Sequence, residues 1–405
     1  MKNITYLILI AFIFNAKLNA QSGCTDPLAT NYRSDALIND GSCTYNAASI
    51  SPTASYNLTS TLVETSGLIE WNGSLYTHND NTDTHIYQIS ETDGALIKTF
   101  SLHGVTNKDW EEISQDADYI YIGDFGNNAS GNRTDLKIYK IKKSTLSTVP
   151  QIEIINFSYS DQTDFTAKAA NSTDFDCESM VVGSDGIYLF TKQWLGKKTS
   201  IYKLLKSAGT QKANFITTLD VAGLVTGATF KEDLHLIALC GYTETLSPFI
   251  YLIYDFTASD FAVSNKRKID VSLPFYQIEG IATSNGLDYF LSNEKFERLP
   301  FVSNPQKLHK ISLNSYLSQY FKDLSVDDFG VQTSKGFLYP NPTDGEIKIN
   351  SKDNIGQEYK IFDSTGKAKA TGILNSNSLN LDNFIKGIYI LTLTESKQTY
   401  KIIKK

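Results

Sequence analysis

The chain has 405 residues, with 23 Tyr, 22 Phe and only 20% charged residues, a composition typical of a β-rich globular protein rather than a disordered chain or a helical bundle. The net charge is −7 and the pI about 5.4, which argues against nucleic acid or anionic lipid as a partner, since both need a basic face. With five His and two Met, a His-rich metal site is disfavoured.

Residues 1–20 are typical of a signal peptide. The apolar run Tyr6 to Phe14 is long enough for a signal sequence and too short to span a bilayer. Cleavage after Ala20 would leave Gln21 as the mature N-terminus. The alternatives are a lipobox that ends at Cys24, which places the polar Gln21 where an apolar residue is needed, and a buried N-terminal strand. We expect no transmembrane segment in the mature chain.

Residues 21–50 are expected to form a small module and linker. Cys24 and Cys43 enclose a loop rich in Asp and Asn, and an exported chain meets an oxidising compartment, so we expect a disulfide between them. The phrases Cys-Thr-Asp-Pro-Leu-Ala-Thr-Asn-Tyr and Asp-Gly-Ser-Cys resemble short repeats of exported Bacteroidetes proteins and, distantly, thrombospondin type 3 calcium repeats. The oxygen-bearing side chains that suit Ca²⁺ are Asp26, Asn31, Asp35 and Asp40. A disulfide-closed spacer without an ion is the alternative.

One short unit recurs from about Ser55 to Leu313. A small or acidic residue stands ten positions before an aromatic or apolar residue in a β-forming run, in the pairs Ser66–Tyr76, Glu111–Tyr121, Glu178–Tyr188, Thr226–Leu236 and Glu279–Tyr289. Third strands are expected at 85–89, 137–141, 200–204, 249–253 and 307–311, and fourth strands at 96–102, 152–159, 214–219 and 268–273. Four short strands per repeat predict the blades of a β-propeller.

The fifth repeat lacks a fourth strand of its own. The segment Tyr56 to Leu62, ahead of the first repeat, can supply it and close the ring, which removes an exposed sheet edge. The sequence therefore predicts an all-β chain with a propeller of five four-stranded blades over 51–328; a sixth, degenerate blade and a β-sandwich are the alternatives. The blade openings, such as Asp-Trp-Glu-Glu-Ile at 109–113, resemble a little-characterised family of bacterial propeller proteins with an acidic motif. That resemblance implies the fold and little about activity.

The innermost strands of a propeller line its channel, so Glu111, Glu178 and Glu279 are expected around one rim. Like charges at short range raise one another's pKa unless a cation neutralises them, and Ca²⁺ is the first candidate for that cation. Ser66 or Thr226 could complete its shell. The alternative is that each Glu only caps amide groups of a neighbouring strand.

A second set of polar residues follows the second strands, on loops of the same region. Its members are His78, Asn79, Asp80, Asp124, Asn127, Asn128, Lys192, Tyr242, Asn293 and Glu294. Binding residues favour loops on a rigid scaffold, so this set predicts a site for a glycan or a polar small molecule at the channel mouth. Cys177 and Cys240 are expected to be buried thiols; a disulfide between them, which would need contact between adjacent blades, is the alternative.

The segment 337–405 differs from the middle of the chain. It contains Tyr-Pro-Asn-Pro before an Asp-Gly turn, strand-like runs at 359–363 and 388–394, and a basic Lys-Ile-Ile-Lys-Lys terminus. It resembles the type A C-terminal sorting domain of the type IX secretion system of Bacteroidetes, joined here by a linker at 329–336. The resemblance implies a small Ig-like β-sandwich, Sec export to the periplasm followed by contact with the type IX machinery, and a secreted or surface-attached protein. An ordinary Ig-like or carbohydrate-binding sandwich is the alternative.

Two classes of function remain for such a protein. The first is a secreted or cell-surface propeller that binds a glycan or another polar extracellular ligand. The second is a calcium-dependent extracellular hydrolase of phytase-like, lactonase-like or esterase-like type. The sequence has no Gly-x-Ser-x-Gly elbow, His-Glu-x-x-His motif or phosphate loop, which favours the binding class.

Overall fold

The computed structural model describes residues 21–256, 260–324, 338–349, 355–363, 366–394 and 399–405. The predicted signal peptide and the linker at 329–336 lie outside the described residues. The chain divides into two compact units, Met1–Tyr320 and Phe321–Lys405. No helix within the described ranges is long and apolar enough to cross a membrane.

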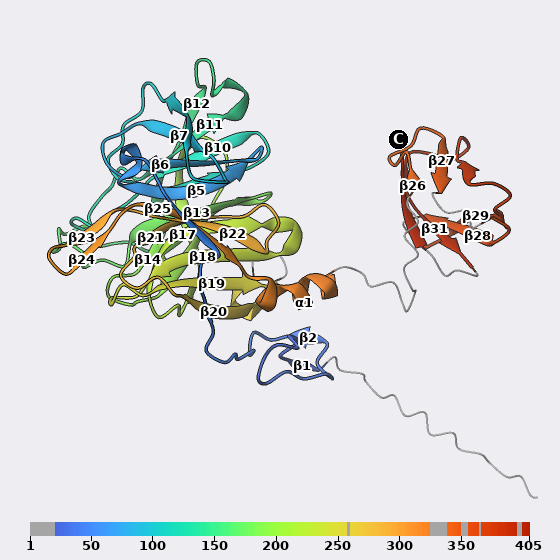
Figure 1. Ribbon diagram of the computed structural model, residues 1–405, viewed down its shortest axis with the longest axis horizontal. Coiled ribbons are helices and arrows are strands. Elements are labelled where there is room, and N and C mark those ends of the chain that lie inside the picture. Colours follow the sequence, from blue (N-terminus) through green and yellow to red (C-terminus); the bar gives the residue numbers. More distant parts are fainter. Residues whose placement is uncertain (1–20, 257–259, 325–337, 350–354, 364–365, 395–398) are drawn as a thin grey trace, which may run out of the picture. The chain divides into compact units, whose positions relative to one another are not determined.

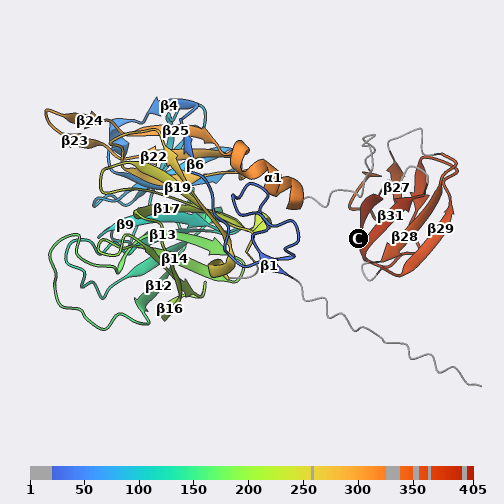
Figure 2. The ribbon, with the colours of Figure 1, turned by 90° about the horizontal axis from the view of Figure 1, so that it is seen from below.

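The first unit contains a five-bladed β-propeller (Figures 1 and 2). Blade one consists of β5 (Thr65–Trp71), β6 (Ser74–Asn79), β7 (His85–Ile89) and β8 (Leu96–Ser101). Blade two consists of β9 (Trp110–Gln115), β10 (Tyr119–Asp124), β11 (Lys137–Lys142) and β12 (Ile152–Tyr159). Blade three consists of β13 (Asp176–Gly183), β14 (Gly186–Lys192), β15 (Thr199–Leu204) and β16 (Gly209–Leu219).

Blade four consists of β17 (Leu224–Lys231), β18 (Leu236–Tyr242), β19 (Pro248–Tyr254) and β20 (Asn265–Val271). Blade five consists of β21 (Ile278–Ala282), β22 (Asp288–Asn293), β25 (Lys307–Ser312) and β4 (Ala54–Asn57). Between β22 and β25 a hairpin is inserted, β23 (Phe296–Arg298) and β24 (Val302–Asn304). The inner strands β5, β9, β13, β17 and β21 contact one another in a closed ring, so the five-blade prediction is confirmed.

The predicted ring closure by the N-terminal segment is confirmed, although the closing strand lies earlier than expected. It spans Ala54–Asn57 rather than 56–62, and pairs antiparallel with β25. The Gln306 side-chain amide donates to the carbonyls of Leu58 and Thr59, at 3.4 and 2.9 Å. These bonds give partners to the two carbonyls that follow Asn57, the last residue of β4 that pairs with β25. A single 3₁₀ turn at Ser60–Leu62 follows.

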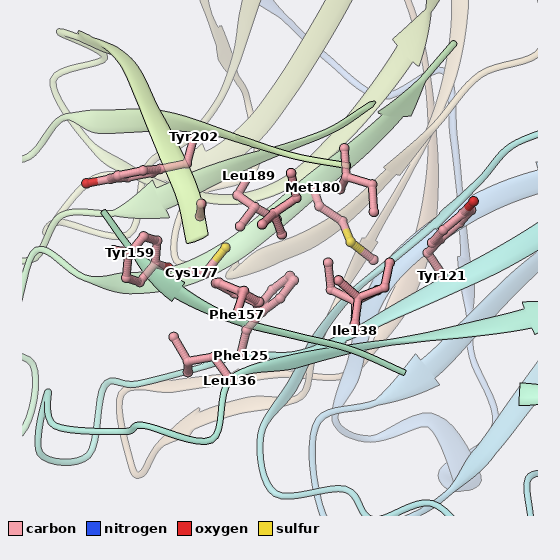
Figure 3. Close-up of a cluster of buried hydrophobic side chains, with 14 of the residues drawn as sticks. Tyr121, Phe125, Leu136, Ile138, Phe157, Tyr159, Cys177, Met180, Leu189 and Tyr202 are labelled. Atoms are coloured by element: carbon pink, nitrogen blue, oxygen red, sulfur yellow. The ribbon is translucent and has the colours of Figure 1, made fainter. Parts of the chain in front are cut away.

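Blades two and three share one sheet, because β12 and β16 pair in parallel at their outer edges. Apolar side chains fill the space between these blades (Figure 3), with Phe157 edge-on to both Phe125 and Tyr159 at ring-centroid distances of 6.4 and 5.7 Å. Burial of each such ring contributes about 1.5–3 kcal/mol. Cys177 packs in this cluster, and both Cys177 and Cys240 are buried free thiols, as the sequence predicts.

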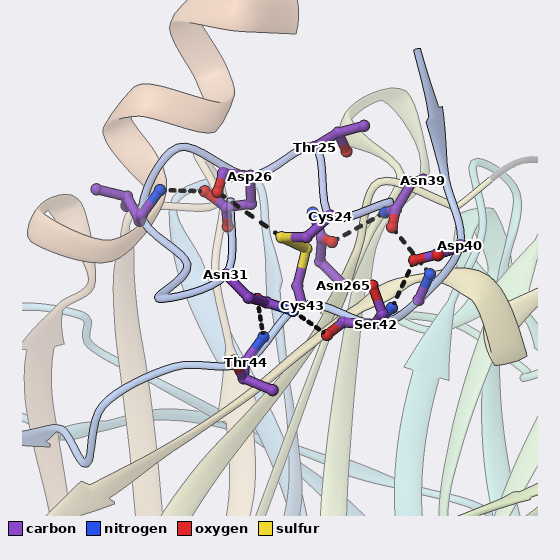
Figure 4. Close-up of a disulfide and its surroundings, with 12 residues drawn as sticks. Cys24, Thr25, Asp26, Asn31, Asn39, Asp40, Ser42, Cys43, Thr44 and Asn265 are labelled. Carbon is purple, nitrogen blue, oxygen red and sulfur yellow. Dashed lines mark hydrogen bonds between the residues drawn. A yellow bond between two sulfur atoms is a disulfide. The ribbon is translucent and has the colours of Figure 1, made fainter. Parts of the chain in front are cut away.

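The disulfide between Cys24 and Cys43 is confirmed (Figure 4), and it leaves no free thiol on Cys24 for a lipid anchor. The surrounding module contains β1 (Ser22–Gly23) and β2 (Ile38–Asn39), and packs on blade four. Asp26 accepts hydrogen bonds from the hydroxyls of Tyr45 and Tyr254. Four positions after Tyr45, β3 (Ser49–Ile50) begins and adds a fifth strand to blade four beside β20.

Calcium in this module stays a prediction. The Oδ1 atoms of Asp26, Asn31 and Asp40 accept backbone N–H groups of Leu28, Thr44 and Ser42 at 2.8, 2.8 and 3.0 Å. Asp35 instead forms an exposed ion pair with Arg33 at 2.9 Å. These carboxylates and amides support local turns of the loop.

The helix α1 (Asn314–Leu324) follows β25 and was not expected in an all-β chain. Leu317 is fully buried, and the hydroxyls of Tyr316 and Tyr320 donate to the carbonyls of Ser49 and Leu234 at 3.0 and 2.8 Å. The spacing of these residues places them on one helical face. The helix therefore holds the N-terminal segment against blade four.

The second unit is a small β-sandwich, which agrees with the expected sorting-domain fold. One sheet consists of β26 (Leu338–Tyr339), β27 (Glu346–Ile349) and β30 (Ser378–Asn380). The other consists of β29 (Ala368–Ile373), β28 (Glu358–Asp363), β31 (Gly387–Leu393) and β32 (Thr399–Lys404). Ile347, Ile361, Leu391 and Ile402 are at most 1% exposed and belong to the core between the sheets.

His309 on β25 connects the closing strand to the rest of blade five. Its Nδ1 lies 2.7 Å from the hydroxyl of Ser55 on β4, and its Nε2 lies 2.9 Å from Oδ1 of Asn293 on β22. The Asn293 amide nitrogen donates to two backbone carbonyls, so its oxygen faces the ring and accepts. The imidazole therefore carries its proton on Nε2 and accepts from Ser55.

We expect His309→Ala to lower the free energy of unfolding of the propeller by about 1–3 kcal/mol, because a buried amide oxygen loses its donor and the closing strand loses a link. Tryptophan fluorescence during urea unfolding measures this, since the three Trp residues, Trp71, Trp110 and Trp194, all lie in blades one to three. The control is His103→Ala at an exposed position, expected to change stability by less than about 0.5 kcal/mol. Equal effects of both variants would contradict the assignment.

Candidate functional site

The residues that mark the sequence repeat are β-bulges of the inner strands. In β9 the ladder passes from Glu112 to Trp110, so Glu111 has no partner on β10. The same skip leaves Glu178, Thr226 and Glu279 unpaired in β13, β17 and β21, while β5 has its irregularity between Ser66 and Ile69. A bulge redirects a side chain out of the regular alternation of a strand. The first residue of the sequence repeat is therefore the residue at which the inner strand of each blade is irregular.

The next position in each blade is small, with one exception. The residues are Gly67, Glu112, Ser179, Gly227 and Gly280. A Cβ atom added at Gly67 would lie 2.7 Å from Oε1 of Glu112, and one at Gly227 would lie 2.5 Å from the carbonyl of Glu279. Small residues in four blades thus leave room for close strand contacts and for the one long side chain of Glu112.

The Glu112 carboxylate is fully buried and binds backbone amides of the inner strands. Oε1 accepts from Ile113 at 3.0 Å and Oε2 accepts from Ala228, on β17, at 2.8 Å. The amides of Leu68 on β5 and Met180 on β13 also stabilise its charge. Burial raises the pKa of Glu112 well above its usual range, against the effect of these four amides. One side chain thus connects the inner strands of blades one to four.

We expect Glu112→Gln to destabilise the propeller by at least about 1–3 kcal/mol, because the amide nitrogen would face a backbone N–H donor that now binds a carboxylate oxygen. Urea unfolding followed by tryptophan fluorescence measures the change. Ser179→Ala is the matched control, since Ser179 stands at the equivalent position of blade three and its buried hydroxyl has no hydrogen-bond partner among the described residues. A Gln variant as stable as the Ala variant would overturn this role of Glu112.

Acidic side chains gather where the inner strands begin, and we call this group the acidic mouth. Its members are Glu64 and Asp80 of blade one, Asp109 and Glu111 of blade two, Asp176 and Glu178 of blade three, and Glu279 and Glu294 of blade five. Each acts electrostatically on others of the group. Four blades therefore direct like charges at one end of the channel.

Lys192 is the cation of the acidic mouth. Its Nζ lies 3.2 Å from Oε1 of Glu178, and both side chains are at most 5% exposed. The ammonium group also lies 4.8 Å from the ring centre of Trp194 and 5.2 Å from that of Tyr242. Burial opposes its charge, but Glu178 and Glu279 outweigh burial and raise the pKa of Lys192, so the ammonium stays charged. The mouth thus contains an ammonium held by a carboxylate and two aromatic rings.

Neighbouring side chains hold these rings and carboxylates in place. The Trp194 indole N–H donates to Oδ2 of Asp176 at 2.7 Å, and the Gln277 amide donates to the hydroxyl of Tyr242 at 3.1 Å. Asp176 also accepts the backbone N–H of Asn127. The mouth is therefore braced from loops of blades two, three and five.

Three carboxylates of the acidic mouth lie close enough together to hold a cation. Within the described residues, oxygens of Glu64, Asp80 and Glu294 lie within 4.8 Å of one another. Burial raises the pKa of Asp80 to about 7, and Glu64 and Asp109 add to the shift. Burial also raises the pKa of Glu294 to about 8, with Asp80 and Glu64 adding to it. At neutral pH Asp80 and Glu294 therefore retain part of their protons, which a bound cation would displace.

The predicted calcium ligands Glu111, Glu178 and Glu279 lie at equivalent bulges and are all buried. In the described part of the chain, the acidic group with the spacing of a metal site is instead Glu64, Asp80 and Glu294, and Lys192 stands beside Glu178. Ser66 and Thr226 donate to the carbonyls of Glu111 and Ile278 on the next inner strand. Calcium at the predicted residues stays a prediction.

The predicted loop residues separate into two groups. Asp80, Lys192, Tyr242 and Glu294 meet at the acidic mouth. His78, Asn79, Asp124 and Asn293 are at most 2% exposed. Asn79 donates to the Thr61 carbonyl, Asp124 pairs with Arg133 at 2.8 Å, and burial lowers the pKa of His78 to about 4. The buried residues of this second group therefore hold neighbouring loops in place, and the imidazole of His78 is uncharged.

Sequence reasoning missed Glu64, Asp109, Asp176, Trp194 and the role of Glu112. One signal for two of them was present, since Asp109 and Asp176 each precede a bulge glutamate by two positions in Asp-Trp-Glu and Asp-Cys-Glu. Gly126 gives a second signal, because an added Cβ there would lie 2.3 and 2.4 Å from oxygens of Glu111 and Asp109. The glycine makes room for both carboxylates.

We expect the melting temperature of the propeller to fall as pH rises from about 6.5 to about 8.5. Asp80 and Glu294 have folded-state pKa values of about 7 and about 8, above their unfolded values, so their contribution is present at low pH and is lost as pH rises through 7 to 8. His78 and His309, whose pKa values burial lowers to about 4, are neutral in the folded state, and in the unfolded state they lose their protons near pH 6.5, which opposes the fall only at the lower end of this range. Thermal unfolding at constant ionic strength measures the slope.

The double variant Asp80→Asn, Glu294→Gln removes both titrating groups and is expected to flatten this slope. A wild-type melting temperature that stays constant or rises across the range would contradict the raised pKa values.

Comparison with known proteins supports the assignment of the C-terminal unit. Residues 337–405 match the secretion system C-terminal sorting domain family. No curated protein matches the chain.

Solved structures similar to this chain are distant. The PQQ-bound aldose sugar dehydrogenase of Streptomyces coelicolor has 8% identity and a TM-score of 0.37, covering 64% of this chain and 98% of its own. PorZ, a surface component of the type IX secretion system of Porphyromonas gingivalis, has 14% identity and a TM-score of 0.30, covering 84% of this chain and 44% of its own. The fold assignment above therefore rests on strand order, and residues 337–405 form a type IX sorting domain behind a β-propeller.

Proposed function

We propose that this protein is an extracellular binding protein, exported by the type IX secretion system, that holds a polar ligand such as a glycan at the acidic mouth. The sorting domain implies contact with the secretion machinery and export to the cell surface or the extracellular space. The observation that carries the proposal is the convergence of carboxyl groups from four blades around the buried ammonium of Lys192.

The chemistry of the mouth fits a ligand rich in hydroxyl or amino groups. Carboxylates accept hydrogen bonds, Lys192 donates them, and Trp194 and Tyr242 offer aromatic faces beside the ammonium. Asp80 and Glu294, with pKa values near neutrality, can donate when protonated and accept when ionised. Perturbed carboxyl groups concentrated in one place are typical of functional sites.

The second candidate is a metal-dependent hydrolase that acts at the same mouth. The close approach of Glu64, Asp80 and Glu294 favours it, because a hard divalent cation takes carboxylate oxygens and relieves their mutual repulsion. In that function the ion would polarise an ester or phosphoester group of the substrate.

Binding of the full chain to an array of neutral, acidic and amino-containing oligosaccharides tests the proposal. We expect Asp80→Asn to weaken the best binding at least about tenfold, a loss of about 1.4 kcal/mol. The control Asp233→Asn alters an exposed carboxylate outside the mouth and should leave binding unchanged. Binding that survives Asp80→Asn would place the ligand elsewhere.

Thermal unfolding with and without Ca²⁺ distinguishes the binding protein from the metal-dependent hydrolase. If the trio holds Ca²⁺, millimolar Ca²⁺ should raise the melting temperature of the wild type over that in EDTA, and Glu294→Gln should abolish the rise. Identical wild-type curves in the two buffers would remove the hydrolase candidate.

A further inference from the structure

Exposed apolar side chains stand on the loops that surround the acidic mouth, and we call them the apolar rim. They are Leu195, Phe275, Leu299 and Phe301, with exposed fractions of 64%, 50%, 75% and 90%. Leu299 and Phe301 occupy the tip of the β23–β24 hairpin, which begins two residues after Glu294 and projects from the left of the propeller in Figures 1 and 2. Large apolar groups gathered on one exposed face mark interaction sites.

Backbone and side-chain contacts connect the rim to the mouth. Leu195 follows Trp194, whose indole N–H donates to the mouth carboxylate of Asp176. At the base of the hairpin, the Lys295 N–H donates to the carbonyl of Val63, next to Glu64, at 2.8 Å. The Asn304 amide, on β24, donates to the Phe275 carbonyl at 2.6 Å. One loop therefore carries both Glu294 and the apolar residues Leu299 and Phe301, and hydrogen bonds connect the other rim loops to it or to the mouth.

The charge of the mouth selects the kind of partner. Its eight acidic side chains outnumber the buried cations of the described residues around them, Lys192 within the mouth and Arg133 beside Asp109, and this imbalance disfavours acidic polymers and anionic lipid surfaces and favours cations. Lys192 itself shows that the mouth accommodates an alkylammonium group, held by Glu178 and two aromatic rings. The trio Glu64, Asp80 and Glu294 has no such cation among the ion pairs of the described residues.

We propose that the partner of this face is a polypeptide segment with Lys or Arg side chains flanked by apolar side chains. A cationic group of the segment enters the trio Glu64, Asp80 and Glu294, and its apolar neighbours lie on Leu299, Phe301 and the rest of the rim. This inference rests on the proposed function, because it assigns the ligand class of the same mouth. Complementary charge gives orientation and fast association, and the buried apolar contacts slow dissociation.

Fluorescence anisotropy of labelled octapeptides with the full chain tests the proposal. The probe alternates Lys and Leu. Three matched probes replace Lys by Glu, Lys by Gln, or Leu by Ser. We expect the Lys–Leu peptide to bind, the Glu–Leu and Gln–Leu peptides not to bind, and the Lys–Ser peptide to bind at least about tenfold more weakly. Binding of the Lys–Leu peptide should weaken as salt increases.

Variants separate the two parts of the surface. The double variant Leu299→Ser, Phe301→Ser alters only exposed side chains and should weaken Lys–Leu binding at least about tenfold. Val149→Ser, at a position 81% exposed on the loop before β12, is the control and should change nothing. Asp80→Asn should weaken both the Lys–Leu and the Lys–Ser peptide, while the rim variant should affect the Lys–Leu peptide alone.

The outcomes also separate this inference from the proposed function. No Lys–Leu binding, equal binding of the Glu–Leu peptide, or an unaffected rim variant overturns the inference. If an oligosaccharide still binds and Asp80→Asn removes it, the proposed function survives that failure. If neither peptide nor oligosaccharide responds to Asp80→Asn, both are overturned.

Discussion

The carboxylate of Glu112 is the interaction on which the channel of this propeller depends. It binds amide groups of Ile113 and Ala228, and those of Leu68 and Met180 also stabilise it, so one side chain connects inner strands that are far apart in sequence. Its presence requires a glycine at Gly67, the equivalent position of blade one, where an added Cβ would lie 2.7 Å from Oε1 of Glu112. The bulge just before that position then directs the preceding side chain differently from the strand ladder. Channel packing and the placement of the bulge carboxylates Glu111, Glu178 and Glu279 are consequences of one local backbone irregularity that recurs in the blades.

The acidic mouth brings many acidic side chains close together, an arrangement that the propeller fold itself does not require. Burial and mutual repulsion raise the pKa values of Asp80, Asp109 and Glu294 toward neutrality, although Lys192 opposes the shift at Asp80 and Glu294 and Arg133 opposes it at Asp109. Such an arrangement costs stability, and a cationic or hydrogen-bonding ligand would recover part of that cost on binding. The sorting domain requires none of it, since it is a separate sandwich with its own core. The sorting domain and the acidic mouth therefore belong to different parts of the chain.

The blade number and the closing strand could be predicted because each depends on local pattern. The ten-residue offset between Glu178 and Tyr188, for example, follows from a bulge and a tight turn within one hairpin. The helix α1 was missed because its Tyr and Leu residues also fit a strand, and contacts with Ser49 and Leu234 stabilise it. The trio Glu64, Asp80 and Glu294 joins residues from the two blades that meet at the closure, which no single stretch of sequence reveals. Polar residues at the ends of the second strands divide between the acidic mouth and the support of neighbouring loops according to their partners, as Asp80 and Asn79 show.

The closing strand also sets an order of events for the growing chain. Ser55 and His309, which meet across β4 and β25, are 254 positions apart, so a chain made from its N-terminus holds Ala54–Asn57 without a partner until almost the whole propeller exists. Contacts at such separation slow folding and leave an edge open to wrong pairings. The cystine module, docked on blade four through Asp26 and β3, holds the same segment near its final position once blade four has formed. It thereby keeps the closing strand β4 close to blade four until blade five has formed and β25 can pair with it.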